Sequence, residues 1–144
     1  MRLALALAAE AAAAGEVPVG CVIVDRSGRV LGRGRNRREE RRSALAHAEM
    51  EAISMACKTV GGFRLDSSAL VVTLEPCPMC AGAILNARIP VLVYGAREEN
   101  SGSCGSVLNL FEERFGHRPA IYGGVLETEC AALLRDFFGK LRNK

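Results

Sequence analysis

Residues 71–95 read VVTLEPCPMCAGAILNARIPVLVYG, and this stretch decides the fold. Residues 71–74 form a short apolar run that ends at a Glu-Pro pair, which is typical of a buried strand. Residues 77–87 predict a helix, and Pro90 opens a second apolar strand at 91–95. Because strand, helix and strand follow in this order, we expect the two strands to lie parallel and to be joined by a helical crossover.

The segments on both sides extend this sheet. Residues 17–24 are almost wholly apolar and residues 30–35 follow after a short turn, which predicts a β-hairpin; residues 120–122 predict a last short strand. The sequence therefore predicts an α/β protein, with a mixed sheet and helices on both faces, in one domain over residues 1–144. Helices are expected at 3–14, from Ser43 to about Val60, at 77–87 and from about Glu127, with polar loops at 37–43 and 96–105.

The composition is that of a globular protein. The chain has 144 residues, of which 49% are hydrophobic and 24% charged, which excludes a disordered or collagen-like chain. No apolar run reaches the ~18 residues that a membrane span needs. The opening MRLALALAAEAAAAG is superficially similar to a secretory signal. Glu10 interrupts that apolar run and Ala and Leu are strong helix formers, so a first helix ending at Gly15 is the preferred interpretation.

Six cysteines are spread along the chain, at positions 21, 57, 77, 80, 104 and 130. A secreted disulfide framework is one interpretation of an even number, but such frameworks belong mostly to chains too small to build a core. Only Cys77 and Cys80 have the spacing of metal ligands. We interpret the other four as small apolar side chains, with Cys104 the most exposed and oxidisable, and we favour a reduced, cytoplasmic protein.

Positive charge is concentrated in one segment. Residues 25–42 hold eight arginines and three acidic residues, a net charge of +5, whereas the other residues sum to −2. Arg29, Arg33, Arg35 and Arg37 alternate with uncharged residues, as on an exposed strand face. A basic segment suits a polyanion such as RNA, but a solvated Arg-rich hairpin explains the same charges equally well.

His47, Cys77 and Cys80 have the chemistry of a zinc site. The two cysteines stand three residues apart at the start of a predicted helix, where unpaired backbone N–H groups and the helix dipole favour the metal-binding thiolate. One imidazole completes three protein ligands, and three ligands with an open fourth position are typical of catalytic zinc. A structural site with four ligands is the alternative, although the sequence offers no convincing fourth ligand.

Glu49 is the candidate general base beside this site. Two thiolates offset the charge of Zn²⁺, so a nearby base is needed to take the proton of the attacking water and to return it to the substrate. Residues two apart in mid-helix point about 200° away from each other. His47 and Glu49 therefore serve one site only if His47 lies at the mouth of its helix.

The order His-x-Glu and then Pro-Cys-x-x-Cys, 30 residues later, is the signature of zinc-dependent nucleobase deaminases. The chain resembles one such family, the bacterial tRNA-specific adenosine deaminases, from about residue 3 to residue 142. The resemblance implies a cytidine-deaminase-like three-layer α/β/α sandwich with a mixed five-stranded sheet, a homodimer, and one zinc ion per subunit. It also implies conversion of adenosine to inosine at the wobble position, position 34, of tRNA-Arg. It rests on EVPVG (16–20), Asn36-Arg37, HAEM (47–50), TLEPCPMCAGA (73–83), ARIP (87–90), YGA (94–96), GVLE (124–127) and ECAALL (129–134).

The resemblance assigns roles to the site residues. It makes His47, Cys77 and Cys80 zinc ligands and Glu49 the proton shuttle. Asn36 matches the position that hydrogen-bonds the flipped adenine, which suits a side-chain amide because it both donates and accepts. Without the resemblance, a turn residue after the hairpin is the preferred interpretation of Asn36.

Three more residues match positions that grip the anticodon arm of the tRNA. Phe138 could stack on a base, while Arg64 and Arg142 could bind phosphates. A core aromatic and exposed helix charges are the other interpretations of these side chains.

Two competing functions remain. A small-molecule nucleobase deaminase acting on guanine or cytosine shares the metal motif, and the basic segment favours a polyanion over it. A non-catalytic, zinc-stabilised RNA-binding module predicts four ligands and no role for Glu49, which does not fit a carboxylate placed beside three ligands.

Overall fold

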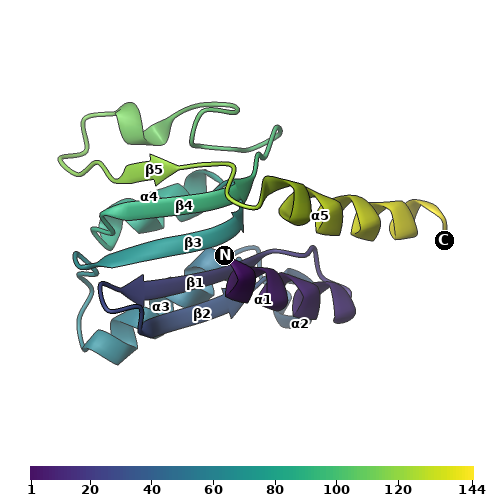
Figure 1. Cartoon of the computed structure of the whole chain (residues 1–144), viewed down its shortest axis with the longest axis horizontal. Coiled ribbons are helices and arrows are strands. Elements are labelled where there is room, and N and C mark those ends of the chain that lie inside the picture. Colours follow the sequence, from purple (N-terminus) through teal and green to yellow (C-terminus); the bar gives the residue numbers. More distant parts are fainter.

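The computed structural model describes residues 1–144 and contains a mixed five-stranded sheet (Figure 1). The strands are β1 (Gly20–Asp25), β2 (Val30–Arg35), β3 (Ser68–Leu74), β4 (Val91–Ala96) and β5 (Ala120–Tyr122). They lie in the order β2-β1-β3-β4-β5. β1 pairs antiparallel with β2 and with β3, whereas β3, β4 and β5 run parallel. The predicted hairpin and the predicted parallel pair are therefore both confirmed.

Helices lie on both faces of the sheet, which confirms the three-layer architecture. In Figure 1, α3 and α4 lie behind the sheet, and α1 and α5 lie in front of it. α5 also extends beyond the ends of the strands, so that its last turns project from the body of the molecule (Figure 1). The helices are α1 (Arg2–Ala13), α2 (Arg38–Arg41), α3 (Ala48–Val60), α4 (Pro78–Asn86) and α5 (Glu127–Arg142), with a 3-10 turn η1 at Leu110–Glu112.

Two expectations between the hairpin and α3 were wrong. Residues 37–43, expected to be a loop, contain the single turn of α2. Ser43 does not begin the next helix, which starts at Ala48 with His47 as its N-cap residue. The reason is that the Arg37 N–H donates to the carbonyl of Ala46 at 3.0 Å, which holds the segment before His47 in a turn.

β1 also begins three residues later than expected, because Pro18 has no N–H to donate to a ladder.

The main hydrophobic core lies between the sheet and the pair α3 and α4. α3 lies directly on β2 because β2 presents glycines to it. A Cβ atom on Gly32 would lie 2.2 Å from the Ala52 carbonyl oxygen, and one on Gly34 would lie 2.3 Å from the Ala48 carbonyl oxygen. Gly32 and Gly34 therefore set the close approach that fixes where α3 begins relative to the sheet.

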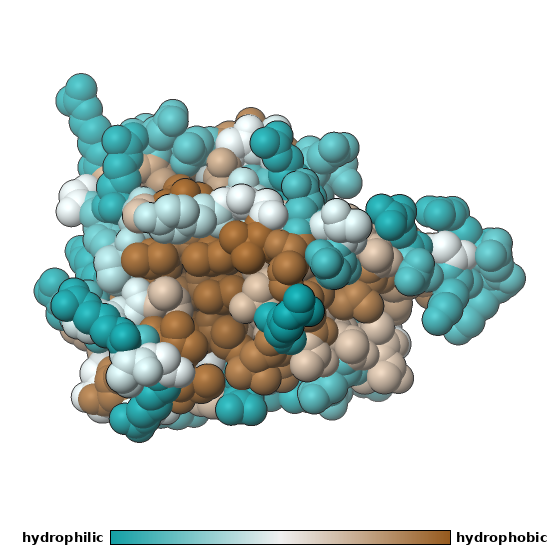
Figure 2. All heavy atoms as spheres, viewed as in Figure 1, coloured by the Kyte–Doolittle hydropathy of each residue, from teal (hydrophilic) through white to brown (hydrophobic).

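The opposite face of the sheet is only partly covered. Leu7 on α1 packs on Val22 of β1. The strand register places Val71 and Val93 on the same face as Val22, and both are half-buried. Figure 2 shows the resulting apolar surface beside α1.

The arginines of the hairpin region are partly neutralised within the chain. Arg35 and Arg37 contact Glu40 at 3.3 and 2.8 Å, while Arg37 and Arg41 contact Glu51 at 2.8 and 2.9 Å. The side chain of Arg35 is only 12% exposed, so the expectation of an exposed face that includes Arg35 was wrong. The net charge of residues 25–42 is therefore larger than the positive charge that these residues offer to a ligand.

The cysteines are all free, and none of the helices is both long and apolar enough to cross a membrane. Cys21 and Cys130 are buried, as expected of apolar side chains. Burial raises the pKa of Cys104 to about 12, so the expectation that this thiol is the most oxidisable was wrong. Cys57 is half-buried, and burial raises its pKa as well.

Candidate active site

The site lies where the N-termini of α3 and α4 meet, next to the end of β3. His47 is the N-cap residue of α3, with an extended backbone (φ −82°, ψ 154°), and Cys77 is the N-cap residue of α4 (φ −75°, ψ 173°). Because His47 stands outside the regular helix, the difficulty of placing it on one side with Glu49 disappears. Both side chains line the same cavity.

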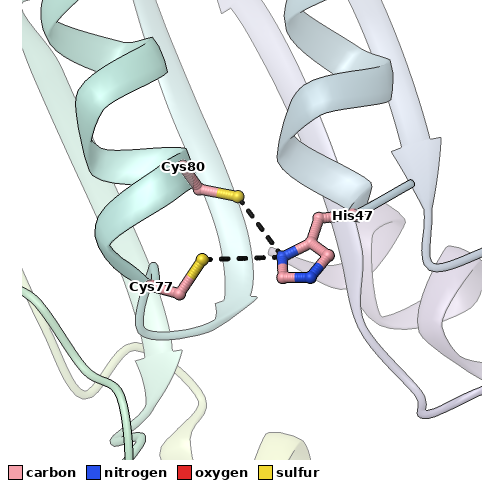
Figure 3. Close-up of side chains that lie close together, drawn as sticks. All are labelled: His47, Cys77 and Cys80. Atoms are coloured by element: carbon pink, nitrogen blue, oxygen red, sulfur yellow. Dashed lines mark hydrogen bonds between the residues drawn. The ribbon is translucent and has the colours of Figure 1, made fainter. Parts of the chain in front are cut away.

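The three predicted metal ligands come together. The Nδ1 atom of His47 lies 3.6 Å from Cys77 Sγ and 3.5 Å from Cys80 Sγ (Figure 3). All three ligand atoms lie within 4.8 Å of one another. A tetrahedral ion with Zn–S of about 2.3 Å and Zn–N of about 2.0 Å separates sulfur and nitrogen ligands by about 3.5 Å. The spacing and the soft donor set therefore fit Zn²⁺, with Nδ1 as the imidazole ligand.

In the absence of a metal, the pKa values of Cys77 and Cys80 are shifted in opposite directions. The hydrogen bond from Cys80 and that from His47 lower the pKa of Cys77 to about 4, although its burial opposes this. The hydrogen bond to Cys77 and burial both raise the pKa of Cys80. The lowered pKa favours the thiolate of Cys77, which is the form that binds a metal ion.

Glu49 is buried beside this cluster, with 4% of its surface exposed. Burial raises the pKa of its carboxyl group above the ordinary value. A carboxylate whose pKa is raised in this way binds a proton more readily than an exposed one, which suits a group that takes up a proton and passes it on.

The cavity in front of Glu49 has a volume of ≈ 520 Å³, its open mouth included. One wall comes from the segment before β1 and the hairpin end, and the other from the residues after β3 and β4. Its lining residues are Val17, Val19, Asn36, Arg38, His47, Ala48, Glu49, Leu74, Glu75, Cys77 and Glu98.

Asn36 lies in this cavity and is only 6% exposed. Its side-chain amide donates to the Val17 carbonyl oxygen at 3.3 Å, and its side-chain oxygen accepts from the Arg38 N–H at 3.3 Å. These contacts fix the orientation of the amide and still leave one N–H and one lone pair free. The side chain thus keeps one donor and one acceptor for a ligand.

The expected RNA contacts are divided between two regions. Phe138 of α5 lines a second pocket that shares Val17, Asn36 and Arg38 with the first. Arg142 is exposed at the end of the same helix. Arg64 follows the far end of α3, which is about 20 Å long, and contacts Asp66 at 3.1 Å, so the structure does not bring it to the cavity.

Arg38 is a cavity residue that the sequence analysis missed. It lines both pockets, is exposed, and makes none of the ion pairs that hold Arg35, Arg37 and Arg41. The hydrogen bond with Cys77 raises the pKa of His47, and the positive charge of Arg38 opposes this shift only weakly. The sequence places Arg38 two residues after Asn36, and this position is the signal that could have identified it. The neighbouring arginines have the same local pattern, so the sequence alone does not distinguish Arg38 from them.

Glu75 is the other missed residue. It is 2% exposed, although it belongs to the motif that carries the resemblance. Burial favours a raised pKa for Glu75, but hydrogen bonds from Ser106, Cys104 and Glu98 outweigh burial and lower its pKa. No pattern in the sequence announces these partners, because they follow Glu75 by 23 to 31 residues.

Residues 1–96 match the family model of the cytidine and deoxycytidylate deaminase zinc-binding region. The chain belongs to this deaminase family. The fold and the family inferred from the sequence are thereby confirmed, and the protein is a deaminase of the hydrolytic type.

Two curated relatives align with nearly the whole chain. The tRNA-specific adenosine deaminase of Bacillus subtilis is 46% identical over 145 aligned residues, covering 100% of this chain and 89% of the relative. A relative from Deinococcus radiodurans, named tRNA(Ile)-lysidine synthase, is 47% identical, but the chain spans only 24% of its length.

Two solved structures are also similar to this chain. A tRNA:A34 deaminase structure, from work on A-to-I editing at the wobble position, has a TM-score of 0.88 and 44% identity. The alignment covers 93% of this chain and 97% of that chain. The guanine deaminase of Bacillus subtilis has a TM-score of 0.66 and 33% identity, covering 99% of this chain and 91% of that chain.

Proposed function

We propose that this deaminase acts on adenosine in tRNA and forms inosine at the wobble position, position 34, of tRNA-Arg. The observation that carries the proposal is the continuity of two pockets. The cavity with the His-Cys-Cys cluster and Glu49 shares Asn36 and Arg38 with a surface pocket that Phe138 lines. A flipped base in the first and its neighbouring nucleotide at the second fit a polynucleotide substrate.

His47, Cys77 and Cys80 would hold one zinc ion in each subunit. When bound, zinc supplies a Lewis acid that makes water nucleophilic near neutral pH. The remaining chemistry belongs to side chains of the chain itself.

Glu49 is the proposed proton carrier. Its carboxylate would take a proton from the attacking water and deliver it to N1 of adenine, as the new C–O bond forms at C6. It would take the second proton as the C6 carbonyl forms and pass it to the exocyclic nitrogen, whose bond to C6 then breaks. The atoms balance as adenosine plus water giving inosine plus ammonia.

Asn36 is proposed to orient the base. Its free N–H and its free lone pair would meet an acceptor and a donor on the purine, while its bonds to Val17 and Arg38 keep it from rotating. Phe138 would stack on a neighbouring base, and Arg142 would contact phosphates along α5. Arg64, at the far end of α3, would bind the anticodon arm only through a surface other than this cavity.

A small-molecule guanine or cytosine deaminase is the second candidate, because guanine deaminases share the fold. Arg38 favours the polynucleotide. Its guanidinium is free of ion pairs at the rim of the cavity, where a base attached to a backbone would place its phosphates.

The side-by-side assay of guanine, cytosine, cytidine and an anticodon stem-loop separates the candidates. We expect ammonia release from the stem-loop and binding that weakens strongly with salt, as phosphate contacts require. Release from a free base, with none from RNA, would establish the small-molecule enzyme instead.

The Glu49→Gln variant tests the chemical assignment. The amide cannot carry a proton but occupies the same space, so we expect unchanged zinc content and RNA binding with inosine formation lowered by at least about 100-fold. The measurement is reverse transcription of tRNA-Arg after incubation, reading adenosine 34 as guanosine. Turnover within a few-fold of the unmodified protein would remove Glu49 from the mechanism.

We also propose that the chain is one deaminase domain and works as a homodimer in the cytoplasm. The six free cysteines, two of them in the cluster, suit a reducing compartment.

A further inference from the structure

Glu75 holds a whole loop with one buried carboxylate. Its oxygens accept hydrogen bonds from the N–H groups of Glu98 (3.3 Å), Cys104 (2.9 Å) and Ser106 (3.2 Å), and from the Ser106 hydroxyl (2.5 Å). All four donors belong to residues 98–106, which we call the capping loop. A carboxylate with four donors around two oxygens is close to its full capacity as an acceptor.

The capping loop packs closely around the carboxylate of Glu75. A Cβ atom on Gly102 would lie 2.4 Å from the Glu75 Oε2 atom and 2.4 Å from the Glu98 carbonyl oxygen, so only glycine fits at this position. The Ser103 N–H donates to the Pro76 carbonyl at 2.9 Å, which fastens the loop to the residue before Cys77. The loop contains no helix or strand of its own, so contacts of this kind decide its position.

The loop also forms part of the candidate active site. Glu98, at its start, lines the cavity together with Glu75, His47 and Glu49. Glu75 is therefore placed between the metal cluster and a cavity wall that has no regular structure. Its oxygens are occupied by donors of the loop, which leaves it unsuited to carry a proton for the substrate.

We propose that Glu75 is a positioning residue that holds the capping loop as a wall of the substrate cavity and thereby sets the affinity for the base. The inference deepens the proposed function and rests on it only for the identity of the substrate. The physical reason is that charge-assisted hydrogen bonds to a buried carboxylate are about twice as strong as neutral ones. An amide in its place would turn an N–H group toward N–H donors of the loop.

The test compares Glu75→Gln with Glu99→Gln, which makes the same chemical change at an exposed residue of the same loop. We expect Glu75→Gln to raise amide hydrogen exchange at Cys104 and Ser106 by about 10-fold or more. KM for the anticodon stem-loop should rise about 10-fold, with a smaller change in kcat, while zinc content stays the same. Glu99→Gln should leave every reading unchanged.

Gly102→Ala disturbs the same contact from the loop side and leaves the carboxylate in place. It should reproduce both the faster exchange and the raised KM, which protects the test if Glu75→Gln fails to fold. Unchanged exchange at Cys104 and Ser106 in both variants would overturn the proposal. So would a loss of kcat with KM and exchange unaltered, because Glu75 would then act in the chemistry.

The hydrogen-exchange reading also separates the two proposals. If the unmodified protein forms no inosine in RNA but Glu75→Gln still loosens the loop, the proposed substrate is wrong and the anchoring stands. If inosine forms normally in both proteins and the loop stays protected, the anchoring is wrong and the substrate stands.

Discussion

At the scale of the residue, the same side-chain type has different chemistry at different places in this fold. Cys77 and Cys104 are both half-buried thiols. Hydrogen bonds from Cys80 and His47 lower the pKa of Cys77 to about 4, whereas burial raises the pKa of Cys104 to about 12. Because the thiolate is the reactive form, burial alone does not determine which cysteine is reactive.

We predict that zinc removal exposes Cys77 to alkylation. Iodoacetamide at pH 7 should label Cys77 in chelator-treated protein and spare it in zinc-loaded protein, as followed by peptide mass spectrometry. Cys104 should remain unlabelled in both, because a thiol of pKa about 12 is protonated at neutral pH, and its thiolate fraction rises about tenfold for each added pH unit. Faster labelling of Cys104 than of Cys77 in the metal-free protein would contradict this assignment.

At the scale of the element, the position of α3 decides whether the site exists. α3 presents His47 and Glu49 at its N-terminus and lies on Gly32 and Gly34 of β2. Two glycines in an edge strand weaken that strand by themselves. Their benefit is the close approach of the α3 backbone, which brings His47 to Cys77 and Cys80.

We predict that Gly34→Ala destabilises the protein and damages the site. Its Cβ would lie 2.3 Å from the Ala48 carbonyl oxygen and 2.9 Å from the Ala52 nitrogen, so the backbone of α3 must move. Overpacking of this kind costs about 1–3 kcal/mol of unfolding free energy, measurable by urea denaturation. Zinc affinity should fall as well, because Ala48 directly follows His47.

Gly62→Ala is the matched control, since a Cβ at Gly62 meets nothing within 4 Å. It should change the free energy of unfolding by less than about 0.5 kcal/mol. Equal stability of the two variants would show that α3 adjusts to the added methyl group.

At the scale of the whole molecule, apolar surface remains on the outer side of α3. Leu45 is 62% exposed and Met55 44% exposed, and both line a surface groove together with Met50. This groove begins at the residues directly before His47, so a second copy bound there would lie close to the site.

We predict that Met55→Glu converts the proposed homodimer into a monomer. Light scattering should give about twice the 15.4 kDa chain mass for the unmodified protein and about once that mass for the variant. Phe115→Glu replaces an apolar residue of similar exposure, 51%, in the loop before β5 and should leave the dimer intact. A dimer that persists in Met55→Glu would place the interface elsewhere, for example on the half-buried valines Val71 and Val93 of the sheet.

The sequence by itself determined the strands, the crossover and the donor set of the cluster, because these depend on local signals. Apolar runs between Gly and Pro predict strands, and a Cys-x-x-Cys pair after a strand predicts ligands at a helix start. The same signals misplaced the start of α3, since a Ser cap and the turn before His47 compete over a few residues.

Only the tertiary structure decided how His47 and Glu49 share one cavity, which arginines keep a free charge, and what Glu75 does. Arg38 differs from Arg37 because Glu40 and Glu51 contact one and not the other. Glu75 receives its donors from a loop 23 to 31 residues later. Such pairings depend on how distant segments meet in space, and no local pattern encodes them.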